Sequence, residues 1–295
     1  MPPEYSFLVN QYGFISAYPL PSEAELSEFY RDLYFEEKVS HTYSAHYDDV
    51  ELEHKKLRAS ATIEFIRQNI DPKADKRFLD IGCGEGFLLD AALTADWDIT
   101  GVDFSTNQVN RLNPKISDFA KAISPTDYLD SCINDGLKFD IISLQNVIEH
   151  VIDPSVLMKK VKSVLSENGI LFAQIPNDFS DLQTLIFNMN FTDKKYWFSP
   201  PQHLHYFNDQ TFEKFATAME FQIVDSMGDF PIEMFLLTGT DNYANNKDRG
   251  LTAHRSRLHL DLFFAKKGLT EYVDLYRAMY ASGITRNILV VMNHL

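Results

Sequence analysis

The stretch "FLDIGCGEGFLLD", residues 78–90, limits what this chain can fold into more than any other segment. An apolar run, three glycines at alternate positions and a second apolar run follow one another. We predict a buried strand over residues 77–81, a tight turn, and a helix from Phe87. Glycines let the backbone turn sharply and let a ligand approach the main chain, and a helix N-terminus adds N–H groups. The pattern predicts a ligand-binding turn, although a turn with only a packing role would show the same glycines.

The spacing of the glycines separates two kinds of ligand. A dinucleotide-binding turn usually has the pattern G-x-G-x-x-G, whereas this turn has G-x-G-x-G. Asp80 stands two residues before the first glycine, where a carboxylate would repel a pyrophosphate. The turn therefore suits a ligand with a cationic group, such as an amino acid headgroup or a sulfonium. A nicotinamide-dependent oxidoreductase is disfavoured for the same reason.

Strands and helices alternate along the middle of the chain. Residues 97–102 have the composition of a second strand, which ends at Asp103. Residues 139–144 form a continuous apolar run, as expected of a strand buried on both faces, and "GILFAQIPN" is a further strand of this kind. The alternation predicts an α/β fold with a doubly wound parallel sheet. An acid at the tip of the second strand typically accepts hydrogen bonds from ribose hydroxyls, and a helix-capping role for Asp103 is compatible with this.

The motifs "LDIGCGEG", "GVDFS", "FDIISLQNVIEHVIDP" and "GILFAQIPN", in this order, resemble those of class I S-adenosylmethionine-dependent methyltransferases. The resemblance implies a Rossmann-like doubly wound seven-stranded sheet and S-adenosyl-L-methionine as cofactor. Asp103 would hold the ribose hydroxyls, and Phe104 would lie beside the adenine. Either Ser124 or Asp127 falls near the place of an adenine-contacting residue. The positions implied for cofactor binding are Asp80, Gly82, Cys83, Gly84, Gly86, Asp103, Phe104, Ser124, Gln145 and Asn146.

The segments around this core suggest how the chain is divided. The last two strands of the family pair as a hairpin, and the only good partner for "FQIVDSMGD" is "RNILVVMN" near the C-terminus. A helical insertion therefore precedes the last strand. The predicted organisation is an N-terminal extension or lid (1–60), a methyltransferase core (61–229 and 284–295), and substrate-side insertions (178–210 and 230–283).

Three histidines follow predicted strand ends and are candidates for a general base. A hydroxyl acceptor is a poor nucleophile and requires a base, most often histidine, whereas an amine acceptor needs only its neutral form. His150 lies in "IEHV", where the alternative role is to shape the pocket. His203 and His205 lie in "PPQHLHYF", and an extended loop would place them on one face. No acidic cluster with clear ligand spacing is present, so we predict no metal.

Two groups of residues are candidates for binding the acceptor. Residues 178–210 are long for a connection in a compact domain and contain Tyr196, Trp197 and Tyr206, which would form a substrate wall. Arg249 and Arg255 belong to a basic stretch in an acidic chain. They would bind an anionic group such as the phosphates of a nucleotide-linked substrate, or they form an ordinary solvated helix face.

The "YWFSPP" and "HLHYF" segments also resemble methyltransferases that act on sugars in cell-surface polysaccharide or antibiotic-sugar pathways. This resemblance implies a small-molecule acceptor, most specifically a hydroxyl of a saccharide or nucleotide-linked sugar in polysaccharide biosynthesis. Two alternatives stay open, namely an N- or C-methyltransferase and a non-catalytic cofactor-binding partner of another enzyme.

Composition restricts the partners. The formal charge of −15 disfavours nucleic acid and anionic membrane surfaces, because both need a basic protein surface. No run of about eighteen apolar residues predicts a membrane span, and the N-terminus lacks the pattern of a signal peptide. We therefore expect a cytoplasmic protein, and its aromatic N-terminal segment is a candidate homodimer surface.

Overall fold

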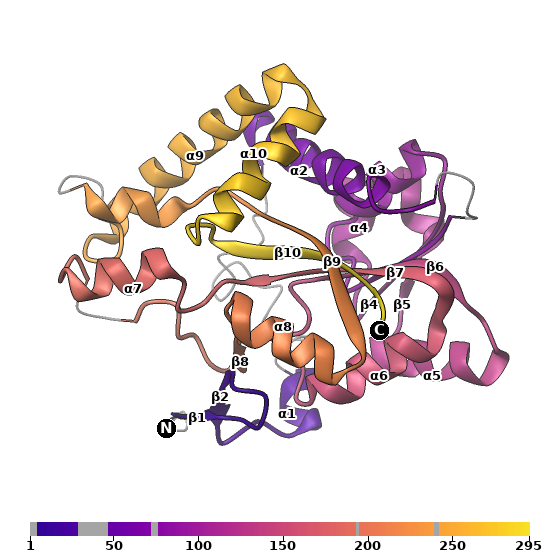
Figure 1. Ribbon diagram of the computed structural model, residues 1–295. Coiled ribbons are helices and arrows are strands. Elements are labelled where there is room, and N and C mark those ends of the chain that lie inside the picture. The colour runs from indigo at the N-terminus through magenta and orange to yellow at the C-terminus, as the bar shows by residue number, and fades with distance from the viewer. Residues whose placement is uncertain (1–4, 29–46, 72–75, 193–194, 239–241) are drawn as a thin grey trace.

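The computed structural model describes residues 5–28, 47–71, 76–192, 195–238 and 242–295 (Figure 1). Its centre is a seven-stranded sheet with the strand order β5-β4-β3-β6-β7-β10-β9. Neighbouring strands are parallel from β5 to β7, and β10 is antiparallel to both β7 and β9. The bounds are β3 Arg77–Ile81, β4 Asp98–Asp103, β5 Ala120–Ala122, β6 Phe139–Gln145, β7 Leu165–Pro176, β9 Phe221–Gly228 and β10 Asn287–His294.

The predicted pairing of the last two strands is confirmed. Val290 of β10 lies opposite Ala173 of β7 and Ser226 of β9. The last strand of the chain therefore lies between two strands that occur much earlier in the sequence. The central strands are buried on both faces, and Ile141 and Ile142 are each no more than 1% exposed although they point to opposite sides. This explains their continuous apolar sequence.

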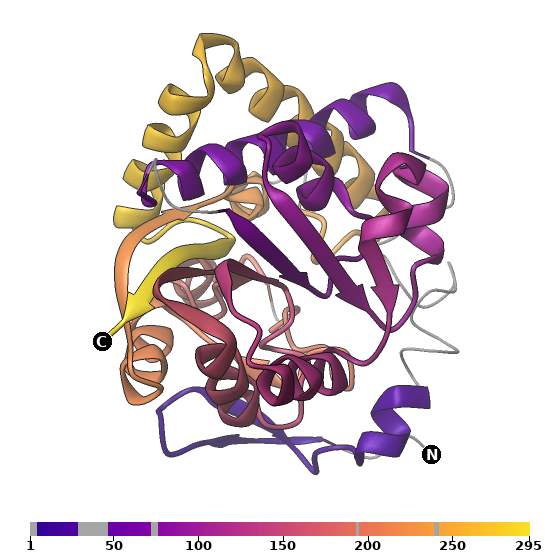
Figure 2. The ribbon, with the colours of Figure 1, turned by 90° about the vertical axis from the view of Figure 1, so that its right-hand side faces the viewer.

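Helices cover both faces of the sheet, as Figure 2 shows from the side. One face packs against α2 (Asp49–Arg67), α3 (Phe87–Thr94) and α10 (Leu269–Ala281). The other face packs against α5 (Pro125–Asp135), α6 (Pro154–Val164) and α8 (Asp209–Ala218). The remaining helices are α1 Glu23–Glu28, α4 Asn107–Leu112, α7 Asp181–Asn188 and α9 Gly250–Phe264, with short 3₁₀ turns at Pro114–Phe119, Ile232–Leu237 (η3), Lys247–Arg249 and Ala265–Lys267. None of the described helices is long and apolar enough to cross a bilayer.

The N-terminal segment forms a small second sheet. β1 (Ser6–Val9) and β2 (Ile15–Tyr18) make a hairpin, and β8 (His205–Tyr206) adds a third antiparallel strand. Phe14 anchors this sheet on the α8 side of the core, where its ring packs on Phe207 and Phe215. Much of the predicted lid, residues 29–46, lies outside the described residues.

The insertion before β10 is fixed to α2 by buried polar contacts. Asp261 of α9 accepts hydrogen bonds from Tyr272 (3.2 Å) and from Tyr276 of α10. Its other oxygen lies 2.7 Å from Nε2 of His54 on α2. Asp261 and His54 are 2% and 4% exposed. Burial raises the pKa of Asp261, but the hydrogen bonds from His54 and Tyr276 and nearby positive charge hold it below its ordinary value.

Replacement of Asp261 by alanine is expected to lower the free energy of unfolding by about 3–5 kcal/mol, because it leaves several buried polar groups without their partner. Urea unfolding measures this. The matched control is Asp274→Ala on α10, which removes an ion pair with Arg277 at a side chain that is 62% exposed; its effect should stay within about 1 kcal/mol. Equal losses in the two variants would contradict a structural role for the buried network.

Candidate active site

The glycine turn joins β3 to α3 in a conformation that only glycine adopts readily. Gly82, Gly84 and Gly86 have φ angles of +74°, +53° and +79°. A Cβ atom on Gly82 would lie 2.7 Å from Val147 Cγ2, and one on Gly86 would lie 2.7 Å from Ile116 Cδ1. Both the backbone conformation and the lack of space therefore require glycine, and the predicted strand, turn and helix are confirmed.

Asp103 ends β4 directly beside this turn. Its carboxylate accepts hydrogen bonds from the Gly84 N–H (2.9 Å) and the Ser105 N–H (3.4 Å), and the residue is 8% exposed. Burial raises the pKa of Asp103. One carboxylate oxygen thus holds the turn while the strand end stays at the ligand-binding edge of the sheet. The neighbouring Phe104 is 47% exposed. Their contacts with ribose and adenine stay predictions.

Asp80 lies in β3, two residues before the first glycine of the turn, and is 2% exposed. Burial, with the charge of Asp103 in addition, raises the pKa of Asp80 to about 7. A carboxyl group whose pKa is higher in the native state than in the unfolded state contributes its full stabilisation only when the pH lies below the unfolded-state pKa. That stabilisation is lost as the pH rises through the native-state pKa.

The Asp80→Asn variant should therefore become progressively more stable than the parent protein as the pH rises. Between pH 5 and pH 8, the difference in the free energy of unfolding should grow by about 2–3 kcal/mol in favour of the variant, because asparagine cannot ionise. Urea unfolding without cofactor at the two pH values measures it, with the exposed Asp98→Asn as control. A difference that does not change with pH would contradict the raised pKa.

A cavity of about 230 Å³ opens where the glycine turn meets the carboxyl ends of β6 and β7. Cys83, Gln145 and Asn146 line it, and their contacts with the cofactor stay predictions. Ser124 is not among the lining residues; it precedes α5, and its hydroxyl lies 2.9 Å from that of Thr126. The choice between Ser124 and Asp127 as the adenine contact stays open.

Helix α2 supplies cavity residues that the sequence analysis did not identify. Lys55, Arg58 and Thr62 line one side of the cavity. Lys55 pairs with Glu85 in the glycine turn (2.6 Å), and Arg58 pairs with Asp229 after β9 (3.2 Å). The spacing of three and four residues places all three on one helix face, and this was the signal available in the sequence. Two cationic groups beside the turn suit the carboxylate of an amino acid ligand.

His205 was predicted as a candidate base, and the structure corrects this. Its Nε2 lies 2.9 Å from the carbonyl oxygen of Val151, so this nitrogen carries the proton. Its Nδ1 then accepts a hydrogen bond from the Ser16 hydroxyl (2.9 Å). The ring is 3% exposed. Because both nitrogens are occupied, His205 links the N-terminal sheet to the turn after β6, and it does not act together with His203.

His150 and His203 lie together with Glu149 in what we call the acceptor cluster. The His150 and His203 rings are 4.8 Å apart between centroids, and His150 Nε2 is 3.7 Å from a carboxylate oxygen of Glu149. His150 Nδ1 donates to the Gln202 carbonyl oxygen (2.5 Å). Burial lowers the pKa of His150 to about 4 and that of His203 well below its ordinary value.

Glu149 is the unexpected member of the acceptor cluster. It is 0% exposed, and neither of its carboxylate oxygens has a hydrogen-bond partner among the described residues. Burial raises the pKa of Glu149 to about 8. Ligand atoms of all three residues lie within 4.8 Å of one another, so this group could also hold a metal ion, although no metal was predicted from the sequence. In the sequence, the only sign of a role for Glu149 was its position immediately before His150.

The predicted substrate residues occupy different environments. Trp197 is 4% exposed, and its ring packs on Tyr196 and Phe179. Tyr206 is a core residue whose hydroxyl donates to the His203 carbonyl oxygen (2.8 Å). Neither predicted arginine lines the 230 Å³ cavity. Arg249 is exposed at the start of α9, and Arg255 forms an ion pair with Asp48, which caps α2. Their role in acceptor binding stays a prediction.

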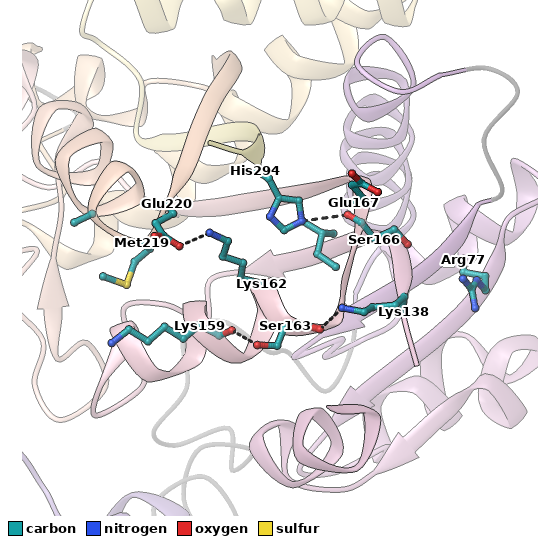
Figure 3. Close-up of a pocket in the computed structure, with 12 residues that line it drawn as sticks. Arg77, Lys138, Lys159, Lys162, Ser163, Ser166, Glu167, Met219, Glu220 and His294 are labelled. Carbon is teal, nitrogen blue, oxygen red and sulfur yellow. Dashed lines mark hydrogen bonds and ion pairs between the residues drawn. The ribbon is translucent and has the colours of Figure 1, made fainter. Parts of the chain in front are cut away.

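A larger cavity of about 1090 Å³ lies at the opposite edge of the sheet (Figure 3). Its basic groups are largely engaged: Lys138 donates to the Ser163 carbonyl oxygen (2.6 Å), and Lys162 pairs with Glu220. Ligands of open α/β sheets bind outside the carboxyl ends of the strands, whereas Arg77 and Lys138 stand at their amino ends. Size therefore does not identify the active site here.

Comparison with known proteins shows which family the chain belongs to. A family model described as "Methyltransferase domain" matches residues 45–226, more than half of the chain. The Ubiquinone biosynthesis O-methyltransferase of Actinobacillus pleuropneumoniae serotype 7 (strain AP76) is 29% identical over 119 residues, which cover 37% of this chain and 50% of that protein. The protein of the same name from Glaesserella parasuis serovar 5 (strain SH0165) is 31% identical over 134 residues, which cover 42% and 55%. The chain thus spans about half the length of the curated relatives it matches.

Among solved structures, the plantazolicin methyltransferase BpumL in complex with S-adenosylhomocysteine has a TM-score of 0.52 and 14% identity. The likeness covers 91% of this chain and 93% of that one, and at this identity it supports the fold alone. The described site also suits the cofactor, because the three glycines line the cavity together with Lys55 and Arg58, which can face the carboxylate of its amino acid part. The chain therefore belongs to the methyltransferase-domain family.

Proposed function

We propose that this enzyme methylates a hydroxyl oxygen of a small-molecule acceptor and that Glu149 accepts the hydroxyl proton. The observation that carries the proposal is the fully buried Glu149 carboxylate, which has no hydrogen-bond partner among the residues that the structure describes. It lies three residues after Asn146, which lines the cofactor cavity and has a φ of +51° where the chain leaves β6. The acceptor cluster therefore begins a few residues after the last residue of this segment that lines the cofactor cavity.

The properties of the cluster suit an oxygen acceptor. S-adenosylmethionine supplies a methyl group that its sulfonium makes electrophilic, so the protein must align the acceptor and exclude water. A hydroxyl also needs a base whose pKa lies near the working pH. Glu149, with a pKa of about 8, meets this condition better than His150, with a pKa of about 4. Glu149 would accept the hydroxyl proton as the acceptor oxygen takes the methyl group and the carbon–sulfur bond of the cofactor breaks.

The histidines have a positioning role in this proposal. His150 is held by the Gln202 carbonyl oxygen, which fixes the proton on Nδ1 and leaves Nε2 facing Glu149. Both rings stay neutral at pH 7 because burial lowers their pKa values. They therefore offer uncharged polar edges beside the carboxylate and do not compete with it for the proton.

Two acceptor classes follow from different observations. A saccharide hydroxyl is favoured by the resemblance of the "HLHYF" segment and by the buried aromatic rings of Tyr196 and Trp197 beside it. Its nucleotide-linked form has weaker support, because Arg255 is already paired with Asp48. The second class is the acceptor of an O-methylation in ubiquinone biosynthesis, which the names of the curated relatives suggest.

The test is methyl transfer from isotope-labelled S-adenosylmethionine to a saccharide, represented by methyl glucoside, and to a phenol, represented by catechol. We expect an O-methyl ether, located by NMR. Exclusive N- or C-methylation in a wider acceptor panel would contradict the proposal. A parallel assay with EDTA and with added Mg²⁺ distinguishes two roles of the cluster: loss and recovery of activity would make Glu149 a metal ligand, and unchanged activity would leave it as the base.

A further inference from the structure

A second group of buried charges adjoins the acceptor cluster at the same edge of the sheet. Asp178 follows β7, Glu233 belongs to η3, and Arg286 immediately precedes β10. Because β10 is antiparallel to β7, its beginning lies at the carboxyl end of β7. Arg286 Nη1 is 3.2 Å from Asp178 Oδ1, and Arg286 Nε is 3.4 Å from Glu233 Oε1. We call these three residues the acidic wall.

The acidic wall has more hydrogen-bond acceptors than donors. Asp178 and Glu233 are each 1% exposed, and one guanidinium serves both carboxyl groups. Gln183 donates to Glu233 Oε1 (3.1 Å), but Asp178 Oδ2 and Glu233 Oε2 have no hydrogen-bond partner within the described part of the chain. Buried carboxylate oxygens without a donor are costly. The wall therefore needs a further donor to be satisfied.

The charge balance gives the sign of the missing group. Two carboxyl groups and one guanidinium leave one negative charge, and Glu149 next to them adds another when ionised. Among the described groups whose charges act on Asp178 and Glu233, Arg286 is the only cation. His150 and His203 are held neutral by burial, and the nearby Asp229 is already paired with Arg58. Burial, with the charge of Glu233 in addition, raises the pKa of Asp178 to about 6, although Arg286 opposes this shift.

Aromatic rings stand beside the wall. The Tyr196 ring lies 5.2 Å from the Trp197 ring and 6.2 Å from the Tyr243 ring, with interplanar angles of 84° and 80°. The charge of Glu233 contributes to the raised pKa values of both tyrosines, which places the carboxylate close to them. Carboxylates combined with aromatic faces are the groups with which proteins bind organic ammonium ions.

We propose that the methyl acceptor carries a protonated amino group in addition to the hydroxyl that is methylated, and that Asp178 and Glu233 bind this ammonium. Its N–H groups would donate to Asp178 Oδ2 and Glu233 Oε2, and its charge would bring the wall to neutrality. Glu149 then remains available for the hydroxyl proton. This inference rests on the proposed function, and it narrows the acceptor to amino alcohols, amino sugars and amine-bearing phenols.

The experiment compares matched acceptors that differ in the amine. The pairs are dopamine with 4-ethylcatechol, and glucosamine with glucose, assayed at pH 7 with isotope-labelled S-adenosylmethionine. We expect at least a tenfold higher kcat/KM for the amine-bearing member of one pair. The Glu233→Gln and Asp178→Asn variants should reduce that value to the level of the neutral member, mainly through KM.

Two controls separate recognition from folding. Thermal stabilisation by S-adenosylhomocysteine should persist in both variants, which shows that the cofactor site is intact. The Glu220→Gln variant removes an exposed acid at the opposite edge of the sheet and should keep the full amine preference. Loss of the preference in Glu220→Gln would contradict a local effect of the wall.

The outcomes distinguish this inference from the proposed function. Equal or lower kcat/KM for the amine-bearing members, or no turnover of either of them, would overturn the inference. O-methylation of neutral acceptors would in that case leave the proposed function intact. Methylation on nitrogen with the preference still dependent on Glu233 would support ammonium recognition and overturn the hydroxyl acceptor.

Discussion

The Glu149→Gln variant is expected to lower kcat by about 10²–10⁴-fold, the usual contribution of a general base. Glutamine keeps the size of the side chain but accepts no proton at neutral pH. Because burial raises the pKa of Glu149 to about 8, the kcat of the parent enzyme should rise with pH up to about pH 8 and then level off. The residual activity of the variant should lack this rise. Initial rates between pH 6 and pH 9 at saturating substrates measure both effects.

The same variant should bind S-adenosylhomocysteine as the parent enzyme does, because Glu149 does not line the cofactor cavity. The matched control is Glu220→Gln, whose kcat should stay unchanged. A Glu149→Gln enzyme with less than a tenfold loss would remove Glu149 from the role of base. A similar loss in His203→Gln, together with the loss of the pH dependence, would transfer that role to the histidine.

The Asp103→Ala variant is expected to weaken binding of S-adenosylhomocysteine by about a hundredfold. Hydrogen bonds to a charged group contribute about 1.5–3 kcal/mol each, and the predicted ribose contacts would be lost. The Gly84 N–H would also lose its acceptor at 2.9 Å, which loosens the glycine turn. Isothermal titration calorimetry measures the change in affinity.

Asp98, at the other end of the same strand, is exposed and provides the control for this measurement. The Asp98→Ala variant should bind the cofactor product with unchanged affinity. An Asp103→Ala protein with near-normal affinity would show that the carboxylate serves only to hold the turn, and the assignment of the ribose contact would then be wrong.

The sequence alone determined the architecture around the cofactor. The strand, the turn of three glycines and the following helix were predictable because their signals are local. Within thirteen positions the sequence has two apolar runs separated by three glycines, which adopt positive φ in the structure. The pairing of β10 with β9 was also predictable, because only one remaining segment had the composition of a buried strand. Asp103 was identified from its place at a strand end.

Only the tertiary structure decided which polar groups share the acceptor side and in which state. His205 is a histidine only two residues after His203 in the sequence. Both of its ring nitrogens nevertheless form hydrogen bonds, one with the Ser16 hydroxyl and one with the Val151 carbonyl oxygen. Lys55 and Arg58 reach the cavity because α2 crosses the glycine turn. Glu149 has a raised pKa because the fold buries it, and no donor in the described part of the chain reaches its carboxylate. Such properties depend on desolvation and on partners brought by chain topology, and neither is a function of local sequence.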